Sequence, residues 1–219
     1  QSLRAQIDPT VAAVMLESIQ GEGGVIPADP AYLQAVQALC RERGLLLIID
    51  EVQTGFCRTG KWFGFEHAGI SPDAVTMAKG MGNGMPVGAL WARRDIASVL
   101  QPGDHGSTYS GTALATAAVS AVISEMKRLH AAELAVRQGA RLTKGLLQIP
   151  AIDSVRGSGL LLGAQLVEGV VAGDVYKALL EKGLIVNAVN ASTLRLAPPL
   201  TVSDAEIDEA VALIAEVLS

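Results

Sequence analysis

The chain has 219 residues, of which 50% are hydrophobic and 18% are charged, so it can bury one large core or two smaller ones. Its formal net charge is −5 at pH 7 and basic residues form no block, which makes nucleic acid and anionic membranes poor partners. The most apolar helical stretch, residues 113–123, is too short to cross a bilayer, so no membrane span is expected. Cys40 and Cys57 form neither a disulfide framework nor a CxxC pair, which favours the reducing cytoplasm.

The first half of the chain alternates short apolar runs with a helical pattern. Pro30 is expected to open a helix over residues 30–43, with apolar positions at helical spacing, and Gly44 is expected to close it. The apolar runs predict buried strands at residues 12–16, 45–49, 74–78 and 87–92. Strand, helix and strand at this spacing form a βαβ unit, so we expect an α/β fold with a mostly parallel sheet covered by helices.

The second half begins with two long helical patterns, at about residues 111–129 and 133–147, and Ile149-Pro150 ends them. Shorter elements follow. Strands are expected at residues 152–155, 160–166, 184–187 and 193–196, and helices at residues 174–182 and 204–218. We therefore predict that residues 1–130 belong to a larger α/β domain and that residues 131–219 form a small C-terminal α+β domain.

Polar side chains follow three of the predicted strands, at the point where each strand ends. Glu17, Asp50 and Lys79 occupy these positions, and a glycine-rich stretch at residues 80–84 follows Lys79. In open α/β sheets, ligands bind beyond the carboxyl ends of the strands. A lysine amine can form a Schiff base with the aldehyde of pyridoxal phosphate, and a carboxylate can keep the pyridine nitrogen of that ring protonated. Asp50 and Lys79 together therefore indicate a pyridoxal phosphate site, although either residue alone would be an ordinary surface side chain.

Several separated segments closely resemble the class III pyridoxal phosphate-dependent aminotransferases, which have the α/β fold of fold-type I transferases. The matching segments read ESIQGEGG at 17–24, DEVQTG at 50–55, RTGK at 58–61, PD at 72–73, AKG at 78–80, GDHGSTY at 103–109 and RLAPPL at 195–200. Within the family, the nearest resemblance is to the acetylornithine aminotransferases, through residues 21–28, 105–108 and 185–188. The ornithine and 4-aminobutyrate aminotransferases share much of this scaffold. By this resemblance, residues 1–130 are the C-terminal part of the large cofactor-binding domain.

The resemblance implies a role for each side chain that would contact the cofactor, pyridoxal 5′-phosphate. Lys79 would form the Schiff base with it and, once released by the substrate, would take the proton from the substrate carbon. Asp50 would pair with the pyridinium nitrogen, which keeps the ring an electron sink. Gln53 would hydrogen-bond the ring hydroxyl, and Val52 would pack on the ring face. Thr108 would reach the phosphate of the cofactor in the neighbouring subunit, which implies a homodimer.

The resemblance also implies substrate-binding residues. Arg195 is the candidate for binding the α-carboxylate of the substrate, because a planar guanidinium can bind a carboxylate bidentately. Glu22 would pair with Arg195 and switch it between substrates, and Ser107 would lie near the substrate. The implied reaction transfers the δ-amino group of N2-acetyl-L-ornithine to 2-oxoglutarate, by a ping-pong route in arginine biosynthesis.

The sequence departs from the family pattern in several places. Ser18 stands where the family usually has proline, and residues 110–114 differ at a helix start that is expected near the dimer interface. The N-terminal half of the family, with its phosphate-binding loop and the aromatic ring that stacks on the cofactor, has no counterpart in these residues. We expect the chain to be the C-terminal part of a longer protein. Taken alone, it should hold pyridoxal 5′-phosphate poorly and be inactive.

Other functions fit the sequence less well. GFCRTGK at residues 55–61 matches the P-loop pattern GxxxxGK, but Trp62 stands where a Ser or Thr must bind magnesium. The histidines are scattered, with no HxxxH pair or cysteine partner, so no metal site is expected. Two alternatives stay open. One is another class III ω-aminotransferase, acting on ornithine, succinyldiaminopimelate or 4-aminobutyrate, and the other is an inactive fragment that only dimerises.

Overall fold

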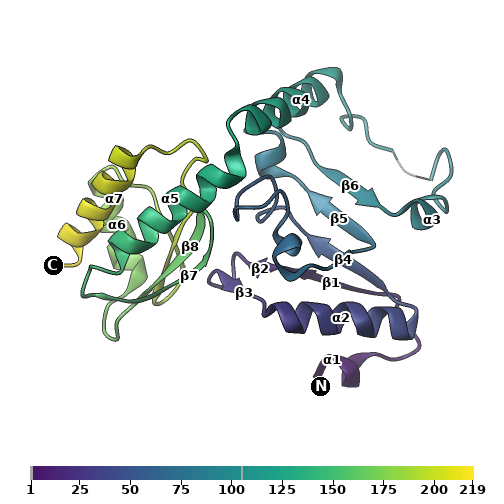
Figure 1. Ribbon diagram of the computed structural model, residues 1–219, viewed down its shortest axis with the longest axis horizontal. Helices are drawn as coiled ribbons and strands as arrows, with labels where there is room; N and C mark the ends of the chain where they lie inside the picture. Colours follow the sequence, from purple (N-terminus) through teal and green to yellow (C-terminus); the bar gives the residue numbers. More distant parts are fainter. Residues whose placement is uncertain (1, 105) are drawn as a thin grey trace. The chain divides into compact units, whose positions relative to one another are not determined.

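The computed structural model describes residues 2–104 and 106–219, and this part of the chain divides into two compact units (Figure 1). The first unit consists of Gln1–Ser18, Ala28–Phe56 and Phe63–Glu125, and the second of Ile19–Pro27, Cys57–Trp62 and Met126–Ser219. Two short segments from the first half of the chain therefore belong to the second unit, and the rest of that unit begins at Met126. Each unit has its own sheet, and each is described separately.

The first unit is built on a mostly parallel sheet, as predicted from the apolar runs. The strand order is β1-β4-β5-β6, with β1 (Ala13–Glu17), β4 (Leu46–Asp50), β5 (Ala74–Met77) and β6 (Ala89–Ala92). Strands β1, β4 and β5 run parallel, and β6 pairs antiparallel with β5. The parallel strands end at one edge of the sheet, which is the edge where a ligand is expected.

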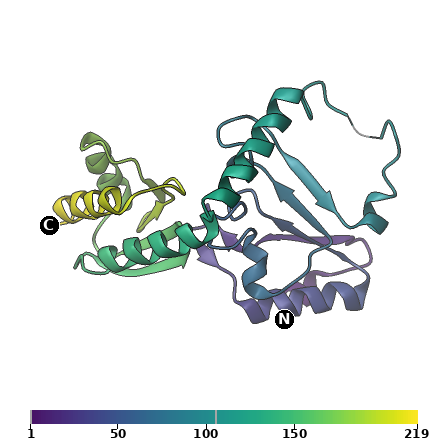
Figure 2. The same ribbon diagram turned by 45° about the horizontal axis from the view of Figure 1, so that its top comes forward.

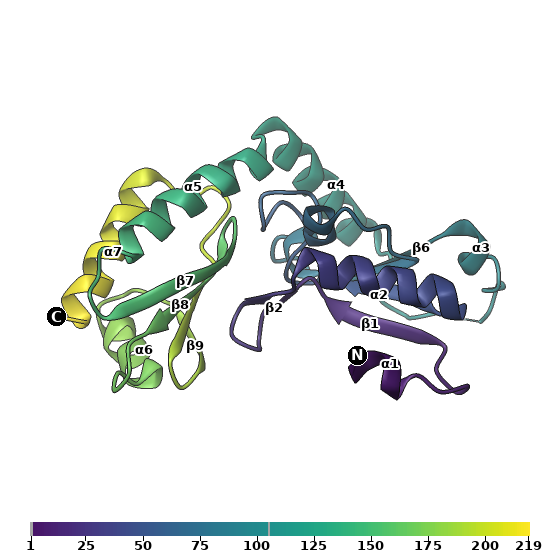
Figure 3. The same ribbon diagram turned by 60° about the horizontal axis from the view of Figure 1, so that its bottom comes forward.

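Helix α2 (Pro30–Arg43) covers one face of this sheet and has the predicted bounds (Figures 1 and 3). At its start, the Asp29 side chain accepts hydrogen bonds from the backbone N–H groups of Ala31 and Tyr32. At its end, Gly44 adopts the left-handed conformation. The buried side chains of the helix form a core with those of β4, and the main members are Leu33, Val36, Cys40, Leu47 and Ile49.

The other elements of the first unit are short or follow the sheet. They are α1 (Ser2–Gln6), the 3₁₀ turns η1 (Gly64–Ala68) and η2 (Lys79–Met81), α3 (Arg94–Ala97) and most of α4 (Ala113–Arg128). Among the described residues, no helix has the length and apolar character needed to span a membrane.

The second unit has an antiparallel sheet with the strand order β7-β8-β10-β9. Its strands are β7 (Ile152–Ser158), β8 (Leu161–Leu166), β9 (Asn187–Asn190) and β10 (Thr193–Leu196). Its helices are α5 (Ala131–Leu146), α6 (Ala172–Glu181) and α7 (Asp204–Val217), and a short hairpin joins β2 (Ile19–Gln20) to β3 (Ile26–Pro27). Figure 2 shows α5, in green, running along β7 and β8.

The two faces of this second sheet differ in polarity, because side chains alternate along each strand. Leu162 and Leu194 belong to the main apolar core of the unit, which the helices complete. Arg156, Gly163 and Arg195 are cross-strand neighbours in β7, β8 and β10, and they occupy the opposite face. This opposite face is therefore the polar one.

Most of the predicted elements are confirmed, and one strand is displaced for a physical reason. The strand predicted at residues 184–187 is instead β9, which begins at Asn187. Gly183 has a φ of 83°, and the Leu184 N–H donates to the Leu179 carbonyl over 2.9 Å, so the residues after α6 complete the end of that helix.

The boundary between the compact units within the helical region falls between Glu125 and Met126, inside α4. The division near residue 130, into part of a large cofactor-binding domain and a small C-terminal domain, stays a prediction.

Candidate active site

Asp50 and Lys79 lie at the same edge of the parallel sheet. Asp50 is the last residue of β4, and its cross-strand partner in β5 is Thr76. The Glu51 N–H donates to the Thr76 carbonyl over 3.0 Å, which continues the pairing past the end of β4. Lys79 is the first residue of η2, and a single residue separates it from the end of β5. The strand ends therefore bring an acid and an amine to one edge, as expected from the sequence.

The backbone of Lys79 adopts a left-handed conformation. Its φ is 43°, a region that costs a residue with a side chain about 1–3 kcal/mol. The Lys79 carbonyl accepts the N–H groups of Gly82 and Asn83 over 3.0 and 3.1 Å. A Cβ at Gly82 would lie 2.3 Å from the Met85 carbonyl oxygen, so the turn closes only with glycine there. This tight turn holds Lys79 at the sheet edge with its side chain exposed.

Asp50 and Thr76 share one face of the sheet, because cross-strand neighbours point to the same side. Asp50 is half-buried, and its Oδ1 accepts the N–H of Val52 over 2.9 Å. Gln53 follows in the same turn, and both Val52 and Gln53 are half-buried. The Thr76 hydroxyl is buried and has no hydrogen-bond partner within the described residues. The edge thus offers a carboxylate beside a hydroxyl whose bonding capacity is unused in this part of the chain.

Glu51, which no sequence pattern singled out, is a fully buried carboxylate directly after β4. Its oxygens accept hydrogen bonds from the Thr54 hydroxyl (2.6 Å) and from the N–H groups of Gly64 (2.8 Å) and Phe65 (2.9 Å). Burial raises the pKa of Glu51, and these hydrogen bonds only partly oppose that rise. Glu51 therefore ties the turn at residues 52–53 to η1 and fixes the direction in which that turn leaves the sheet.

Replacing Glu51 by alanine is expected to destabilise the protein by about 3 kcal/mol, because two buried donors and one part-buried donor would lose their acceptor. The carboxylate also makes stability depend on pH. Since burial raises the pKa of Glu51, the folded protein holds the proton more tightly than the unfolded chain, where the pKa is near 4.5. The stabilisation from this proton is complete below that pH and is lost as the pH rises through the folded pKa.

Urea unfolding from about pH 4 to about pH 8 would measure this effect in the wild type and in Glu51→Gln. Glutamine does not titrate, so the stability of Glu51→Gln relative to the wild type should rise with pH. If the difference in unfolding free energy between Glu51→Gln and the wild type does not change with pH, then the raised pKa of Glu51 is contradicted.

The structure places Ser107 and Thr108 in an exposed turn before α4. The Ser107 hydroxyl oxygen accepts the N–H of Tyr109 over 3.4 Å. His105, from the same motif, lies outside the described residues. The roles of Ser107 near a substrate and of Thr108 at a phosphate group stay predictions.

Glu22 and Arg195 form an ion pair within the second unit, although 173 positions separate them in the sequence. Arg195 Nη1 donates to Glu22 Oε1 over 2.7 Å. The Arg195 side chain, in β10, is 15% exposed, whereas the Glu22 side chain, in the turn between β2 and β3, is 70% exposed. An exposed carboxylate on a turn can move into water while the guanidinium stays against the sheet. Within the pair, the Glu22 carboxylate is therefore the more solvent-accessible partner.

A family model described as aminotransferase class-III matches residues 1–218, nearly the whole chain. The chain belongs to the class III aminotransferases. The acetylornithine aminotransferase of Listeria monocytogenes serotype 4b (strain F2365) is 48% identical over 223 aligned positions, which cover all of this chain and 57% of that protein. The acetylornithine aminotransferase of Bacillus subtilis (strain 168) is 45% identical, over 95% of this chain and 54% of that protein.

Solved structures of class III aminotransferases have the same fold as this chain. The ornithine aminotransferase of Toxoplasma gondii ME49 superimposes with a TM-score of 0.91 and 36% identity, over 98% of this chain and 53% of that chain. Another structure of the Toxoplasma gondii enzyme contains pyridoxal phosphate at partial occupancy at the active site. The class III family is pyridoxal phosphate-dependent and has fold-type I, so the predicted fold class is confirmed. This chain spans about half the length of the relatives that it matches.

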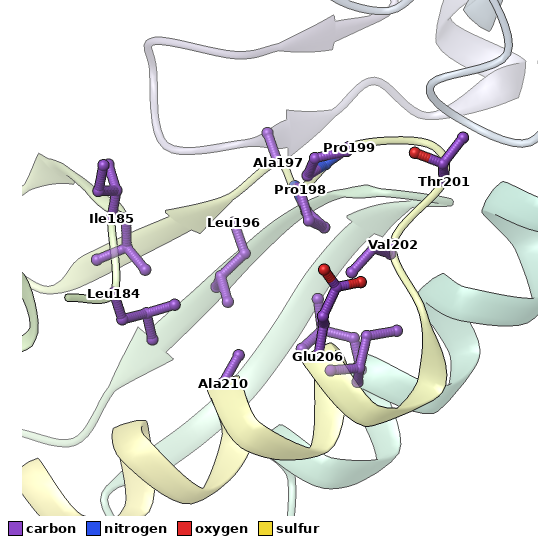
Figure 4. A pocket seen from close by; sticks show the side chains of 13 residues that line it. Leu184, Ile185, Leu196, Ala197, Pro198, Pro199, Thr201, Val202, Glu206 and Ala210 are labelled. Carbon is purple, nitrogen blue, oxygen red and sulfur yellow. The ribbon is translucent and has the colours of Figure 1, made fainter. Parts of the chain in front are cut away.

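A pocket of about 370 Å³ lies in the second unit, and none of the predicted site residues lines it. Its lining is mainly apolar and includes Leu196, Pro198 and Val202 (Figure 4). The charged group in its lining is Glu206, whose carboxylate accepts the N–H and the hydroxyl of Ser203 over 2.7 Å each, as part of the cap of α7. Because this carboxylate is used in capping, the pocket has no chemistry that points to the reaction.

Arg58, from the RTGK motif, has a structural role that the sequence did not indicate. Its Nη1 donates to the carbonyl oxygens of Leu160 (3.2 Å) and Pro198 (2.5 Å). Burial lowers the pKa of Arg58. The segment Cys57–Trp62 is thereby fixed to the residues that follow Arg195 in the second unit.

Proposed function

We propose that the complete gene product is a pyridoxal phosphate-dependent acetylornithine aminotransferase. It would move the δ-amino group of N2-acetyl-L-ornithine to 2-oxoglutarate, a step of arginine biosynthesis. The observation that carries the proposal is the common sheet edge of Asp50 and Lys79. Relatives that are 42–48% identical bear the name acetylornithine aminotransferase, which supports this choice of amino donor.

The residues at this edge fit pyridoxal 5′-phosphate. Lys79 offers an exposed primary amine, the group that bonds to an aldehyde. Asp50, on the neighbouring strand, offers a carboxylate that suits a protonated ring nitrogen, and the buried Thr76 hydroxyl beside it has no partner within the described residues. When bound, the cofactor supplies an electron sink for the electrons released from the substrate carbon.

Lys79 and Asp50 have separate tasks in the proposed reaction. The free Lys79 amine takes the proton from the carbon that bears the amino group, as a general base, and later returns it. The Asp50 carboxylate maintains the positive charge on the ring nitrogen, and this electrostatic contribution grows as negative charge develops in the transition state. Gln53 would hydrogen-bond the ring hydroxyl and Val52 would cover the ring face, from the turn that Glu51 holds.

Arg195 and Glu22 would select the substrates. A guanidinium can bind a carboxylate of 2-oxoglutarate bidentately. The amino donor reacts at its δ-amino end, where no carboxylate adjoins the reacting carbon. Glu22 would neutralise Arg195 while the donor is bound and would leave it for 2-oxoglutarate. The 2.7 Å pair and the 70% exposure of Glu22 support this exchange, and Ser107 is proposed to lie near the substrate.

The proposed assembly is a homodimer, and the proposed location is the cytoplasm. Thr108 would contact the phosphate of the cofactor that a second subunit holds, and its place in an exposed turn leaves it accessible to such a partner. Cys40 and Cys57 are buried thiols that form no disulfide within the described residues, which agrees with a reducing compartment.

An ornithine aminotransferase is the second candidate function. The observation that favours it is the TM-score of 0.91 to the Toxoplasma gondii ornithine aminotransferase. Succinyldiaminopimelate and 4-aminobutyrate are further alternative donors, and an inactive fragment that only dimerises is the alternative of a different class.

Single-turnover mixing of the complete, cofactor-loaded gene product with each amine would separate these candidates. We expect N2-acetyl-L-ornithine to change the visible absorbance of the bound cofactor at least about 10-fold faster than ornithine or 4-aminobutyrate. A faster reaction with ornithine would contradict the donor and keep the class. Failure to hold the cofactor, or to react with any of the amines, would favour the alternative of a protein that only dimerises.

A further inference from the structure

Arg156 and Arg195 flank a glycine on the polar face of the second sheet. Gly163 of β8 pairs with Arg156 on one side and with Arg195 on the other. Neighbouring strands lie about 4.8 Å apart, so the two arginines originate about 10 Å from each other with no side chain between them. A Cβ at Gly163 would lie 3.0 Å from Val25 Cβ and 3.1 Å from the Gly24 carbonyl oxygen. The turn between β2 and β3 therefore sits directly on Gly163, where a side chain would press on Val25 and Gly24.

The Arg156 guanidinium donates hydrogen bonds from three nitrogens. Nε donates to the Gly24 carbonyl over 2.9 Å, Nη1 to Gln165 Oε1 over 3.1 Å, and Nη2 to Thr193 Oγ1 over 2.9 Å. Thr193 is fully buried, and its hydroxyl donates to Gln165 Oε1 over 3.1 Å. Nη1 and Nη2 of Arg156 are thus fixed by side chains of the sheet, and Nε binds the turn between β2 and β3.

The turn that Arg156 holds is the one that carries Glu22. Val25, in the same turn, has a φ of 54° and is fully buried, in a small apolar cluster with Ile19 and Leu161. A left-handed valine persists only where its surroundings hold it. Glu22 lies two residues before Gly24, so fixing the Gly24 carbonyl also fixes the point from which the Glu22 side chain extends.

We propose that Arg156 is a positioning residue that holds Glu22 at Arg195 and thereby sets how readily a substrate carboxylate displaces Glu22. This inference rests on the proposed function, in which such a carboxylate competes with Glu22 for Arg195. Arg156 acts through the turn and does not contact the substrate. Loosening the turn makes Glu22 easier to displace, so carboxylates bind more tightly at Arg195.

Glutarate is a suitable probe, because it is a dicarboxylate without an amino or oxo group and does not react. Its dissociation constant would be measured by calorimetry on the complete, cofactor-loaded gene product. We expect Glu22→Gln to bind glutarate about 10-fold more tightly than the wild type, and Arg156→Met about 5-fold more tightly. In the Glu22→Gln background, Arg156→Met should change the constant by less than about 2-fold, because the group that it positions is gone.

A matched control and a milder variant complete the test. Arg141→Met removes an arginine that pairs with Asp204 and Asp208 on the surface of the same unit, and it should leave glutarate binding unchanged. Thr193→Val removes one acceptor of Arg156 and should tighten binding about 2-fold. If Arg156→Met does not fold, Thr193→Val decides the question alone.

Unchanged or weaker glutarate binding in Arg156→Met, or in Thr193→Val where it decides alone, would overturn the role of Arg156. The role would also be overturned if Arg156→Met changed the glutarate dissociation constant by the same factor in the wild type and in Glu22→Gln. Unchanged binding in Glu22→Gln has a different meaning, because it would overturn the proposed exchange at Arg195 itself.

Discussion

Replacing Lys79 by alanine is expected to lower the turnover of the complete gene product on the order of 10⁴-fold or more. The amine is both the attachment point for the cofactor and the base that moves the proton, so one substitution removes both contributions. The absorbance of the lysine-bound cofactor should disappear in the same variant. Steady-state transamination from N2-acetyl-L-ornithine to 2-oxoglutarate and an absorbance spectrum would measure the two effects.

Lys61→Ala is the matched control for this experiment, because Lys61 is likewise an exposed lysine. It should keep wild-type turnover and the wild-type spectrum. Near wild-type turnover by Lys79→Ala would show that another residue carries the reaction.

Asp50→Asn is expected to lower kcat by about 10²–10³-fold. Asparagine has nearly the same shape and can still accept the Val52 N–H with its side-chain oxygen, so the turn after β4 should be preserved. It lacks the negative charge that maintains the protonated ring nitrogen. The loss should therefore appear in the rate of each half-reaction, measured by stopped-flow absorbance with the cofactor bound.

Asp73→Asn provides the comparison at the opposite end of the same strands. The Asp73 Oδ2 accepts the Leu47 N–H over 2.8 Å, and the carboxylate pairs with Arg93. This substitution should cost about 1–2 kcal/mol of stability without lowering kcat in the folded protein. Equal losses of kcat in the two variants would mean that Asp50 has only a structural role.

Helix α2 and strand β9 show which parts of the fold could be predicted from the sequence. Asp29, Pro30 and Gly44 act within a few residues of the helix ends, so α2 has the predicted bounds. The position of β9 depends on the end of α6 and on pairing with β10, which includes an irregular register between Thr193 and Leu194. The antiparallel direction of β6 likewise depends on its partner strand. Such distant contacts leave no local pattern in the sequence.

Part of the candidate site could be predicted, because the sequence shows which residues stand at strand ends and parallel strands end at the same edge of a sheet. Asp50 ends one strand, and Lys79 comes shortly after the next, which runs parallel to it. The pairing of Glu22 with Arg195 has no such signal, because 173 positions separate the two residues. Family resemblance suggested that pair, and the structure contains it.

Glu51 and Arg156 could not be predicted, because their partners are assembled only in the folded chain. Glu51 accepts two backbone N–H groups of η1, and Arg156 donates to three neutral oxygens from separate segments. Buried polar groups are hydrogen-bonded as a rule, but a sequence does not show which partners they have. The one available signal for Arg156 is the alternation of Ser154, Arg156 and Ser158 in β7, which indicates a polar face.

The attachment of pyridoxal 5′-phosphate at the edge shared by Asp50 and Lys79 can be read directly from the protein. Borohydride reduction of the complete, cofactor-loaded gene product would fix the cofactor to its lysine, and mass spectrometry of the digested peptides would locate it. We predict a phosphopyridoxyl group on Lys79. A phosphopyridoxyl group on a different lysine, with Lys79 unmodified, in protein that transaminated before the reduction would contradict this account.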